Sequence, residues 1–278
     1  MSAARVPVVL LHGLTDSAAC WPSVLNRYAD RPVVALDARG HGGVPLPDEP
    51  FTIAALAADT AAALRDLALG PALVVGHSMG GVTAEELALT APELVAALVL
   101  EDPAWHEDGR LGAAADDAGA VGLGGTAAPT VPADGERGRP TWLGPAIASF
   151  AGRSAEQIAA RGRLDNPDWP EADVLGWAEA KTGVDPRLAE VPHDWVARDW
   201  VGALSGVRVP VTLLTAEPGR SVVTPAQAAR AAAVLGLAPD GLLTHVPVPG
   251  VGHNIRREAP AAYLAALDAA LARADASA

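Results

Sequence analysis

Short runs of β-branched and other apolar residues alternate with longer Ala- and Leu-rich segments along most of this chain. Six of the runs have the length and composition of strands covered on both faces: Val6–Leu11, Pro32–Asp37, Ala72–Gly76, Ala97–Glu101, Val209–Thr215 and Thr244–Val248. Five of the longer segments are predicted helices: Ser17–Ala29, Ile53–Leu69, Met79–Thr90, Pro225–Leu235 and Arg257–Arg273. Strands that alternate with helices predict parallel strands joined by crossover helices, so the expected fold class is α/β.

The alternation breaks between residues 102 and 207. Gly109–Pro140 mixes Gly, Ala, Pro and Asp without periodicity, and we expect a flexible linker there. Helix signals and several tryptophans follow: Ser154 stands three residues before Gln157, as in a capping box, and Pro170 precedes acidic residues that suit a first turn. We therefore expect a helical cap inserted into the core, with residues 1–103 and 207–278 forming the core and residues 104–206 the cap.

Composition and charge exclude several classes of protein. The single cysteine, Cys20, cannot form a disulfide within the chain, which favours a reducing compartment and a cytoplasmic location. The net charge of -13 repels phosphate backbones and anionic lipids, so nucleic acid is not an expected partner. The apolar run at the N-terminus is too short for a signal peptide, and no uncharged stretch reaches the ~18 residues of a membrane span.

The strongest chemical signal is Gly76-His77-Ser78-Met79-Gly80-Gly81, which lies between a predicted strand and a predicted helix. A strand, a sharp turn and a helix hold a serine hydroxyl exposed above the sheet edge, and glycines flank it because larger side chains would clash. Ser78 is therefore a candidate nucleophile. The alternative is an ordinary tight turn.

A serine hydroxyl needs a base to become a nucleophile at neutral pH. His253 lies in a loop between the last predicted strand and the last predicted helix, at the same sheet edge as Ser78. His77 is expected to point away from the serine, and His245 lies within a strand pattern. We therefore predict His253 as the general base, the alternative being a structural loop histidine.

The imidazole in turn needs a carboxylate that fixes its tautomer. Asp102 follows the strand after the serine, and Glu217 follows the next strand along the chain. Both fit the chain order of serine, acid and histidine. Either could instead be a solvated loop carboxylate or a helix cap.

Acyl transfer also places negative charge on an oxygen, which backbone N–H groups can stabilise. Met79 offers one such group at the start of a helix. The tight turn after the first strand, at His12-Gly13-Leu14, offers a second, and we assign it to the Leu14 amide.

These motifs together resemble the α/β-hydrolase superfamily, in its serine hydrolase or esterase type with a helical lid. His12-Gly13 resembles the family's oxyanion loop, Asp37-Ala-Arg-Gly40-His41-Gly42 the loop after the next strand, and Gly76-His-Ser78-Met-Gly80-Gly the nucleophile elbow. Gly252-His253-Asn254 resembles the terminal catalytic loop. The resemblance implies the α/β-hydrolase fold, with a mostly parallel sheet flanked by helices and a cap inserted in the middle of the chain.

The chain departs from the family pattern in two places. Because only five residues precede Val6, we expect a sheet without the family's usual N-terminal hairpin and with about six parallel strands. The aspartate that normally follows the strand Val209–Thr215 is also missing, since only Glu217 stands there. Some relatives place the acid one strand earlier, which corresponds to Asp102, and the resemblance therefore favours Asp102 over Glu217. Serine at the elbow argues against haloalkane dehalogenases and epoxide hydrolases, which use aspartate.

The resemblance and the site together predict a serine hydrolase for an ester, lactone or related acyl bond of a medium-sized apolar molecule. Trp105, Trp142, Trp169 and Trp177 are expected to line its apolar pocket or, alternatively, to hold the cap to the core. The same triad could serve C–C bond hydrolysis, perhydrolysis or acyl transfer, and a ligand-binding protein with little turnover is a further alternative. No metal or organic cofactor is implied, because no cluster has ligand spacing.

Overall fold

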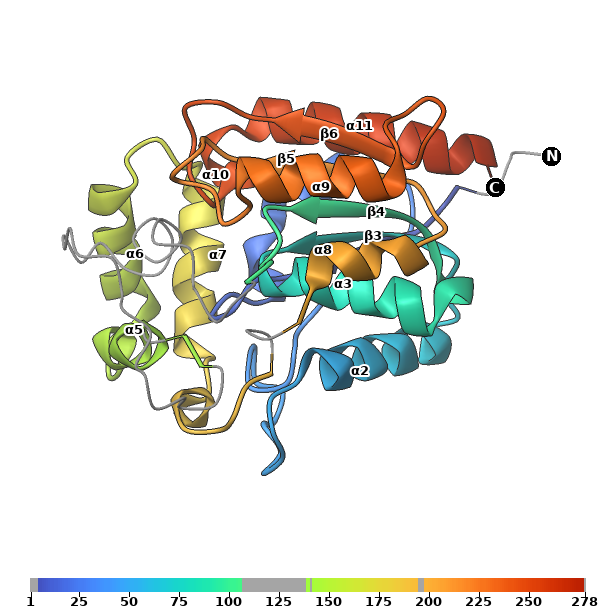
Figure 1. The fold of residues 1–278 in the computed structure, drawn as a ribbon. Coiled ribbons are helices and arrows are strands. Elements are labelled where there is room, and N and C mark those ends of the chain that lie inside the picture. The colour runs from blue at the N-terminus through green and yellow to red at the C-terminus, as the bar shows by residue number, and fades with distance from the viewer. Residues whose placement is uncertain (1–4, 107–138, 141, 195–197, 278) are drawn as a thin grey trace.

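A six-stranded parallel sheet forms the centre of the molecule (Figure 1). The structure is a computed structural model that describes residues 5–106, 139–140, 142–194 and 198–277. The strands follow the order β2-β1-β3-β4-β5-β6. Their bounds are β1 Val8–Leu11, β2 Val33–Leu36, β3 Ala72–His77, β4 Val95–Glu101, β5 Val211–Thr215 and β6 Leu243–Pro247. All six predicted strands are confirmed.

The register brings the carboxyl ends of the central strands to one edge of the sheet. Leu11 at the end of β1 pairs with Gly76 of β3, and His77 at the end of β3 pairs with Glu101 at the end of β4. The residues that follow these strands, among them Ser78 and Asp102, therefore start from neighbouring positions.

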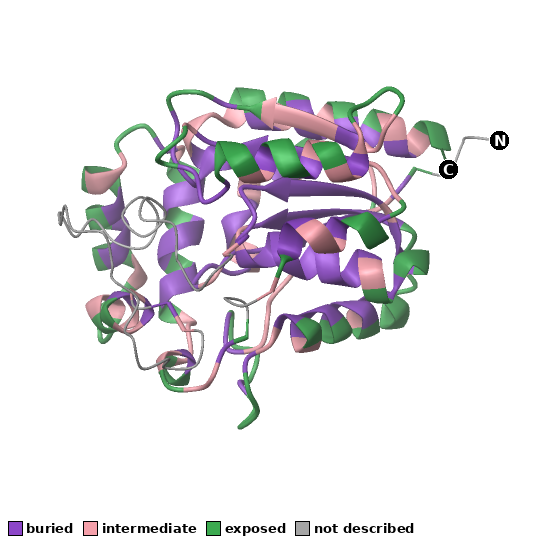
Figure 2. Ribbon diagram, viewed as in Figure 1, coloured by how far each residue is buried: buried purple, intermediate pink, exposed green. Residues whose placement is uncertain are grey.

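Side chains alternate between the two faces of the sheet, as the pleat requires. On one face Val9, Val74 and Leu98 pack in one core cluster. On the other face the next residues along the same strands, Leu10, Val75 and Val99, pack in a second cluster. Both faces are therefore covered: β1, β3 and β5 are buried along their whole length, and β4 at every position except Ala96 (Figure 2).

Helices cover both core clusters. The first cluster packs against α2 (Ile53–Asp66), α3 (Met79–Thr90) and α9 (Pro225–Leu235), and the second against α1 (Pro22–Arg27) and α11 (Pro260–Ser277). A short 3₁₀ turn, η2 (Pro92–Leu94), leads from α3 into β4. The predicted bounds of α3 and α9 are confirmed, whereas α2 ends earlier than predicted.

Two of the predicted helices are broken by proline. The first, predicted over residues 17–29, consists of η1 (Ala18–Cys20) and α1, which begins at Pro22. The last is preceded by a separate turn, α10 (Ile255–Glu258), and α11 begins at Pro260. Proline disfavours the helical conformation of the residue before it. Ala259 accordingly has φ -137° and ψ 61°, so the predicted continuous helix from Arg257 is wrong.

The helices of the cap lie between β4 and β5, as predicted. They are α5 (Leu143–Phe150), α6 (Ala155–Asp165), α7 (Glu171–Thr182), η3 (Pro186–Ala189), α8 (Trp200–Ala203) and η4 (Leu204–Gly206). The capping box of Ser154 and Gln157 is formed at the start of α6, and Pro170 caps α7. Nearly all of the predicted linker Gly109–Pro140 lies outside the described residues, and the domain boundaries remain a prediction.

Helices α5, α6 and α7 gather at the end of the sheet toward which the strand arrows point (Figure 1). The cap thus covers the edge that carries the candidate site. In the described part of the chain, no helix has the length and apolar character needed to cross a membrane.

Candidate active site

Ser78 stands at a sharp turn between β3 and α3. Its backbone has φ 52° and ψ -115°, a conformation that costs energy for a residue with a side chain. The turn is possible because glycines flank it: a Cβ on Gly76 would lie 2.1 Å from the Gly80 carbonyl oxygen, and one on Gly80 would lie 2.1 Å from that of Leu11. The segment has the strand, sharp turn and helix geometry of a nucleophile elbow, and the role of Ser78 as the nucleophile stays a prediction.

Asp102 and His253 form a hydrogen-bonded pair at the same edge. The His253 Nδ1–H donates to Asp102 Oδ2 at 2.7 Å, and the Asp102 side chain is fully buried. This bond places the proton on Nδ1 and leaves Nε2 as the atom that can accept one. Asp102 itself has φ 41°, so it also occupies a strained conformation where β4 ends.

A loop after β5 surrounds the Asp102 carboxylate. The Val222 N–H donates to Oδ2 at 2.9 Å and the Val223 N–H to Oδ1 at 3.1 Å. The Ser221 hydroxyl donates to Oδ1 in a short hydrogen bond. These donors fix the carboxylate and compensate for its burial. Ser221 was not among the predicted site residues, because no local pattern in the sequence marks it.

Glu217 lies in the same loop but does not contact the imidazole. Its Oε2 accepts from the Gly250 N–H at 2.9 Å, and its own N–H donates to the Val251 carbonyl. Glu217 thus ties the β5 loop to the segment that precedes His253. Of the two candidate acids, the structure brings Asp102 to His253.

The amides predicted to bind the oxyanion belong to Met79, which directly follows Ser78, and to Leu14, which follows Gly13. Within the described residues, neither N–H has a hydrogen-bond acceptor. Gly13 approaches the serine so closely that a Cβ on it would lie 3.3 Å from Ser78 Cβ. Met79 begins α3, where the helix dipole favours negative charge. Both amides therefore lack a competing acceptor, and their role as oxyanion donors stays a prediction.

Two histidines hold the loop that carries Leu14. The His12 Nδ1–H donates to the Gly13 carbonyl at 2.8 Å, and its Nε2 accepts from the Ala38 N–H at 3.0 Å. His41 Nε2 accepts from the Thr15 N–H at 3.1 Å. Burial lowers the pKa of His41 to about 3, which keeps the ring neutral and able to accept. In the sequence His41 is marked only as part of the loop that follows the second strand, and no local pattern predicts its contact with Thr15.

His77 packs against the candidate base. Its ring centroid lies 4.6 Å from that of His253, and Nε2 lies 3.2 Å from the His253 carbonyl oxygen, to which it can donate. Burial holds the pKa of His77 well below its usual value. A neutral ring in this place supports the His253 loop without opposing a positive charge on His253.

The four tryptophans predicted to line the site make packing contacts. Trp105 is 2% exposed and donates from its indole N–H to Glu85 Oε2 at 3.0 Å. Trp169 and Trp177 meet edge to face in the cap core, with ring centroids 6.1 Å apart. Trp142 precedes α5 and is partly buried against the main core. These contacts match the alternative in which tryptophans hold the cap together, and a role in lining the pocket stays a prediction.

Glu85, the partner of Trp105, gives the fold a pH dependence that can be measured. Burial raises the pKa of Glu85 from 4.5 to about 8, and its second oxygen has no partner among the described residues. The folded protein therefore holds a proton there that the unfolded chain releases near pH 4.5. This contribution to stability is fully present below pH 4.5 and is lost as pH rises toward 8.

We expect Glu85→Gln to remove this loss of folding stability with rising pH. From about pH 5 to about pH 8, the free energy of unfolding of the variant should rise relative to that of the parent by at least ~1 kcal/mol. Urea titrations at both pH values measure it, with Glu179→Gln, at an exposed position on α7, as the control. A constant difference between parent and Glu85→Gln across this range would contradict the assignment.

Comparison with known proteins identifies the family of the chain. A family model described as alpha/beta hydrolase family matches residues 8–267. The chain is 42% identical over 102 residues to the lipase LipV of Mycobacterium tuberculosis. This matched segment covers 37% of this chain and 39% of LipV. It is also 42% identical over 104 residues to an sn-1-specific diacylglycerol lipase of Xenopus tropicalis, over 36% of this chain and 32% of that protein. Each matched segment therefore covers about two fifths or less of the relative's own length.

A solved structure resembles the whole fold. The N-formylmaleamic acid deformylase of Pseudomonas putida S16 superposes with a TM-score of 0.70 and 22% sequence identity. The superposition covers 96% of this chain and 93% of that chain.

Proposed function

Because this chain belongs to the alpha/beta hydrolase family, we propose that it is a serine hydrolase. Its substrate in this proposal is an ester, a lactone or a related acyl compound of medium size and apolar character. The observation that carries the proposal is the 2.7 Å hydrogen bond between Asp102 and His253 at the sheet edge where the Ser78 elbow ends. The lipase relatives support an acyl bond as the target.

The proposed reaction has two halves. Ser78 Oγ attacks the substrate carbonyl carbon while His253 Nε2 takes the hydroxyl proton, and the Leu14 and Met79 amides donate to the oxyanion. The tetrahedral intermediate collapses to an acyl-enzyme as His253 returns the proton to the leaving oxygen. Water, deprotonated by His253, then attacks the carbonyl carbon of the acyl-enzyme. As the bond to Ser78 Oγ breaks, His253 returns this proton to Ser78, and the acid leaves. Asp102 holds the imidazole in the required tautomer and stabilises its charged form.

Labelling with a fluorophosphonate tests the proposal directly. We expect the native protein to be labelled, and peptide mass spectrometry to place the phosphonyl group on Ser78. The protein after heat denaturation and Ser78→Ala are the controls, and neither should react. Failure of the native protein to label would favour the alternative of a ligand-binding protein with little turnover.

Product analysis then separates hydrolysis from acyl transfer. With 4-nitrophenyl esters of increasing acyl length and a competing alcohol, we expect free acid as the main product. A new ester in place of the acid would identify an acyltransferase that uses the same residues.

A further inference from the structure

Helix α7 of the cap rests directly on the turn that follows the candidate oxyanion loop. A Cβ on Gly176 would lie 2.1 Å from the Ala19 carbonyl oxygen, so the helix backbone touches η1. The Ser23 hydroxyl also donates to Asp173 of α7 at 3.1 Å. This close packing brings the C-terminal turn of α7, which carries Lys181, over residues 15 and 16.

Lys181 donates all three of its ammonium hydrogens to the oxyanion loop. Nζ lies 2.9 Å from the Thr15 carbonyl oxygen, 2.8 Å from Thr15 Oγ1 and 2.9 Å from Asp16 Oδ1. Its side chain is 1% exposed. A buried ammonium is stable only when it is fully paired, and these contacts use its whole donor set.

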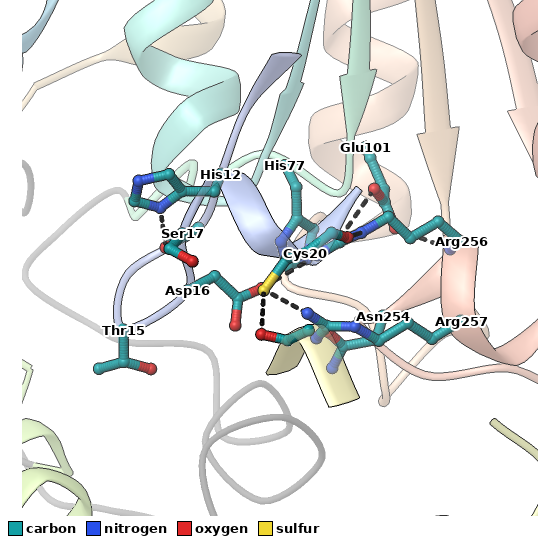
Figure 3. Close-up of polar contacts among 12 residues, drawn as sticks. His12, Thr15, Asp16, Ser17, Cys20, His77, Glu101, Asn254, Arg256 and Arg257 are labelled. Carbon is teal, nitrogen blue, oxygen red and sulfur yellow. Dashed lines mark hydrogen bonds and ion pairs between the residues drawn. The ribbon is translucent and has the colours of Figure 1, made fainter. Parts of the chain in front are cut away.

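Asp16 connects this cation to α10, the helical turn that follows His253. Figure 3 shows Asp16 beside Asn254 and Arg257. Asp16 Oδ2 accepts from Arg256 at 3.0 Å and from Arg257 at 2.8 Å. Arg257 also donates to Asn254 Oδ1 at 2.6 Å, next to His253. Burial alone would raise the pKa of Asp16, but Arg257, Lys181 and Arg256 hold it well below its usual value. The carboxylate is therefore ionised and pairs with cations from two separate segments.

Arg256 extends the contact to the strand that ends at the candidate acid. Its backbone N–H donates to Glu101 Oε1 at 2.8 Å, and its guanidinium pairs with Glu101 Oε2 at 3.2 Å. Glu101 in turn accepts the Ser78 N–H through its carbonyl oxygen. One buried polar network thus joins the cap, the oxyanion loop, the serine turn and the His253 loop.

Within this network, the backbone of Thr15 is strained and depends on its hydrogen bonds to keep its conformation. It follows Leu14 and has φ 64°, in the left-handed region that is costly for a β-branched residue. Its N–H is bound by His41, and its carbonyl and hydroxyl oxygens are both bound by Lys181. The contacts from Lys181 compensate for the strain that keeps the loop in this shape.

We infer that Lys181 is a positioning residue, through which the docked cap holds the oxyanion loop in its working geometry. The inference rests on the proposed function and adds to it that the cap, besides covering the site, completes it. Donors that are held in place before the reaction need no reorganisation when the oxyanion forms. Loss of Lys181 should therefore affect the transition state more than substrate binding.

The test compares Lys181→Met with the parent protein on 4-nitrophenyl butyrate. We expect kcat to fall about 10- to 100-fold, a range typical of a small misplacement of catalytic groups, with KM changed less than about threefold. Inhibition by phenylboronic acid, which forms a tetrahedral adduct on the serine, should weaken by a similar factor, and inhibition by butyrate should not. Arg163→Met, which removes an exposed cation paired with Glu171 of α7, is the control and should leave all four constants unchanged.

Titration of active sites with fluorophosphonate corrects kcat for misfolded protein, so a loss of stability alone would not produce this pattern. If Lys181→Met does not fold, Thr15→Ala decides, since it removes one of the three contacts and should lower kcat several-fold with KM unchanged. Folded variants with unchanged kcat and boronate affinity would overturn the inference. Failure of the parent protein to hydrolyse esters or to label would instead overturn the proposed function.

Discussion

Ser78→Ala is expected to abolish ester hydrolysis, with kcat reduced by ~10⁶-fold, as loss of the nucleophile does in serine hydrolases. The substitution removes the attacking oxygen and leaves the backbone of the elbow as it is, because alanine and serine tolerate a positive φ about equally. Binding should therefore change little, as measured by KM for any residual activity and by the affinity for butyrate. Steady-state kinetics with 4-nitrophenyl butyrate measures the effect.

Ser205→Ala is the matched control, since it removes an exposed hydroxyl in the turn η4, outside the site. It should retain full activity. If Ser78→Ala keeps more than a small fraction of the parent's kcat, Ser78 is not the nucleophile.

Asp102→Asn is expected to reduce kcat by ~10⁴-fold while the protein stays folded. The amide nitrogen of asparagine can donate to Nδ1, which would place the imidazole proton on Nε2, where it blocks the acceptance of the serine proton. The side-chain oxygen, in the Oδ1 position, still accepts from the Val223 N–H and the Ser221 hydroxyl, whereas the Val222 N–H, which shares Oδ2 with His253, loses its acceptor. Kinetics, together with the midpoint of thermal unfolding, separates the chemical effect from a structural one.

Glu217→Gln is the discriminating control for this assignment. Glutamine can still accept from the Gly250 N–H through its amide oxygen, so the loop should keep its shape and kcat should stay within about threefold, as expected where a single exposed hydrogen bond is conserved. An inactive Glu217→Gln beside an active Asp102→Asn would reverse the two roles.

The fold and the candidate nucleophile and base follow from local signals in the sequence. Most strands are apolar runs, although β5 contains Thr212 and β6 contains Thr244 and His245. Ser78 directly follows β3, and His253 lies in the loop after β6. Parallel strands end at one sheet edge, so position along the chain is enough to predict that both residues lie at that edge. The breaks at Pro22 and Pro260 were also visible in the sequence, because proline disfavours helix in the residue before it, but the apolar periodicity obscured them.

The choice between Asp102 and Glu217 could not be made from their positions alone. Both follow strands at the same edge, and the difference lies in which of them the loop at residues 221–223 surrounds with donors. The buried ion network around Asp16 could not be predicted from the sequence for a similar reason. Asp16 and Lys181 are 165 residues apart, and their pairing depends on how the cap docks, which no periodic pattern encodes. The tryptophans mark the cap as a packed unit but do not reveal which surface each ring faces.

Lys181 is the only lysine of the chain, and its side chain is almost completely shielded from solvent. In the docked state an amine-reactive reagent would therefore find no lysine to acylate. Separation of α7 from the core would expose that amine, and the rate at which it is modified would report how often the separation occurs. The native chain thus carries its own probe of cap opening, which can be read by mass spectrometry with and without a bound ligand.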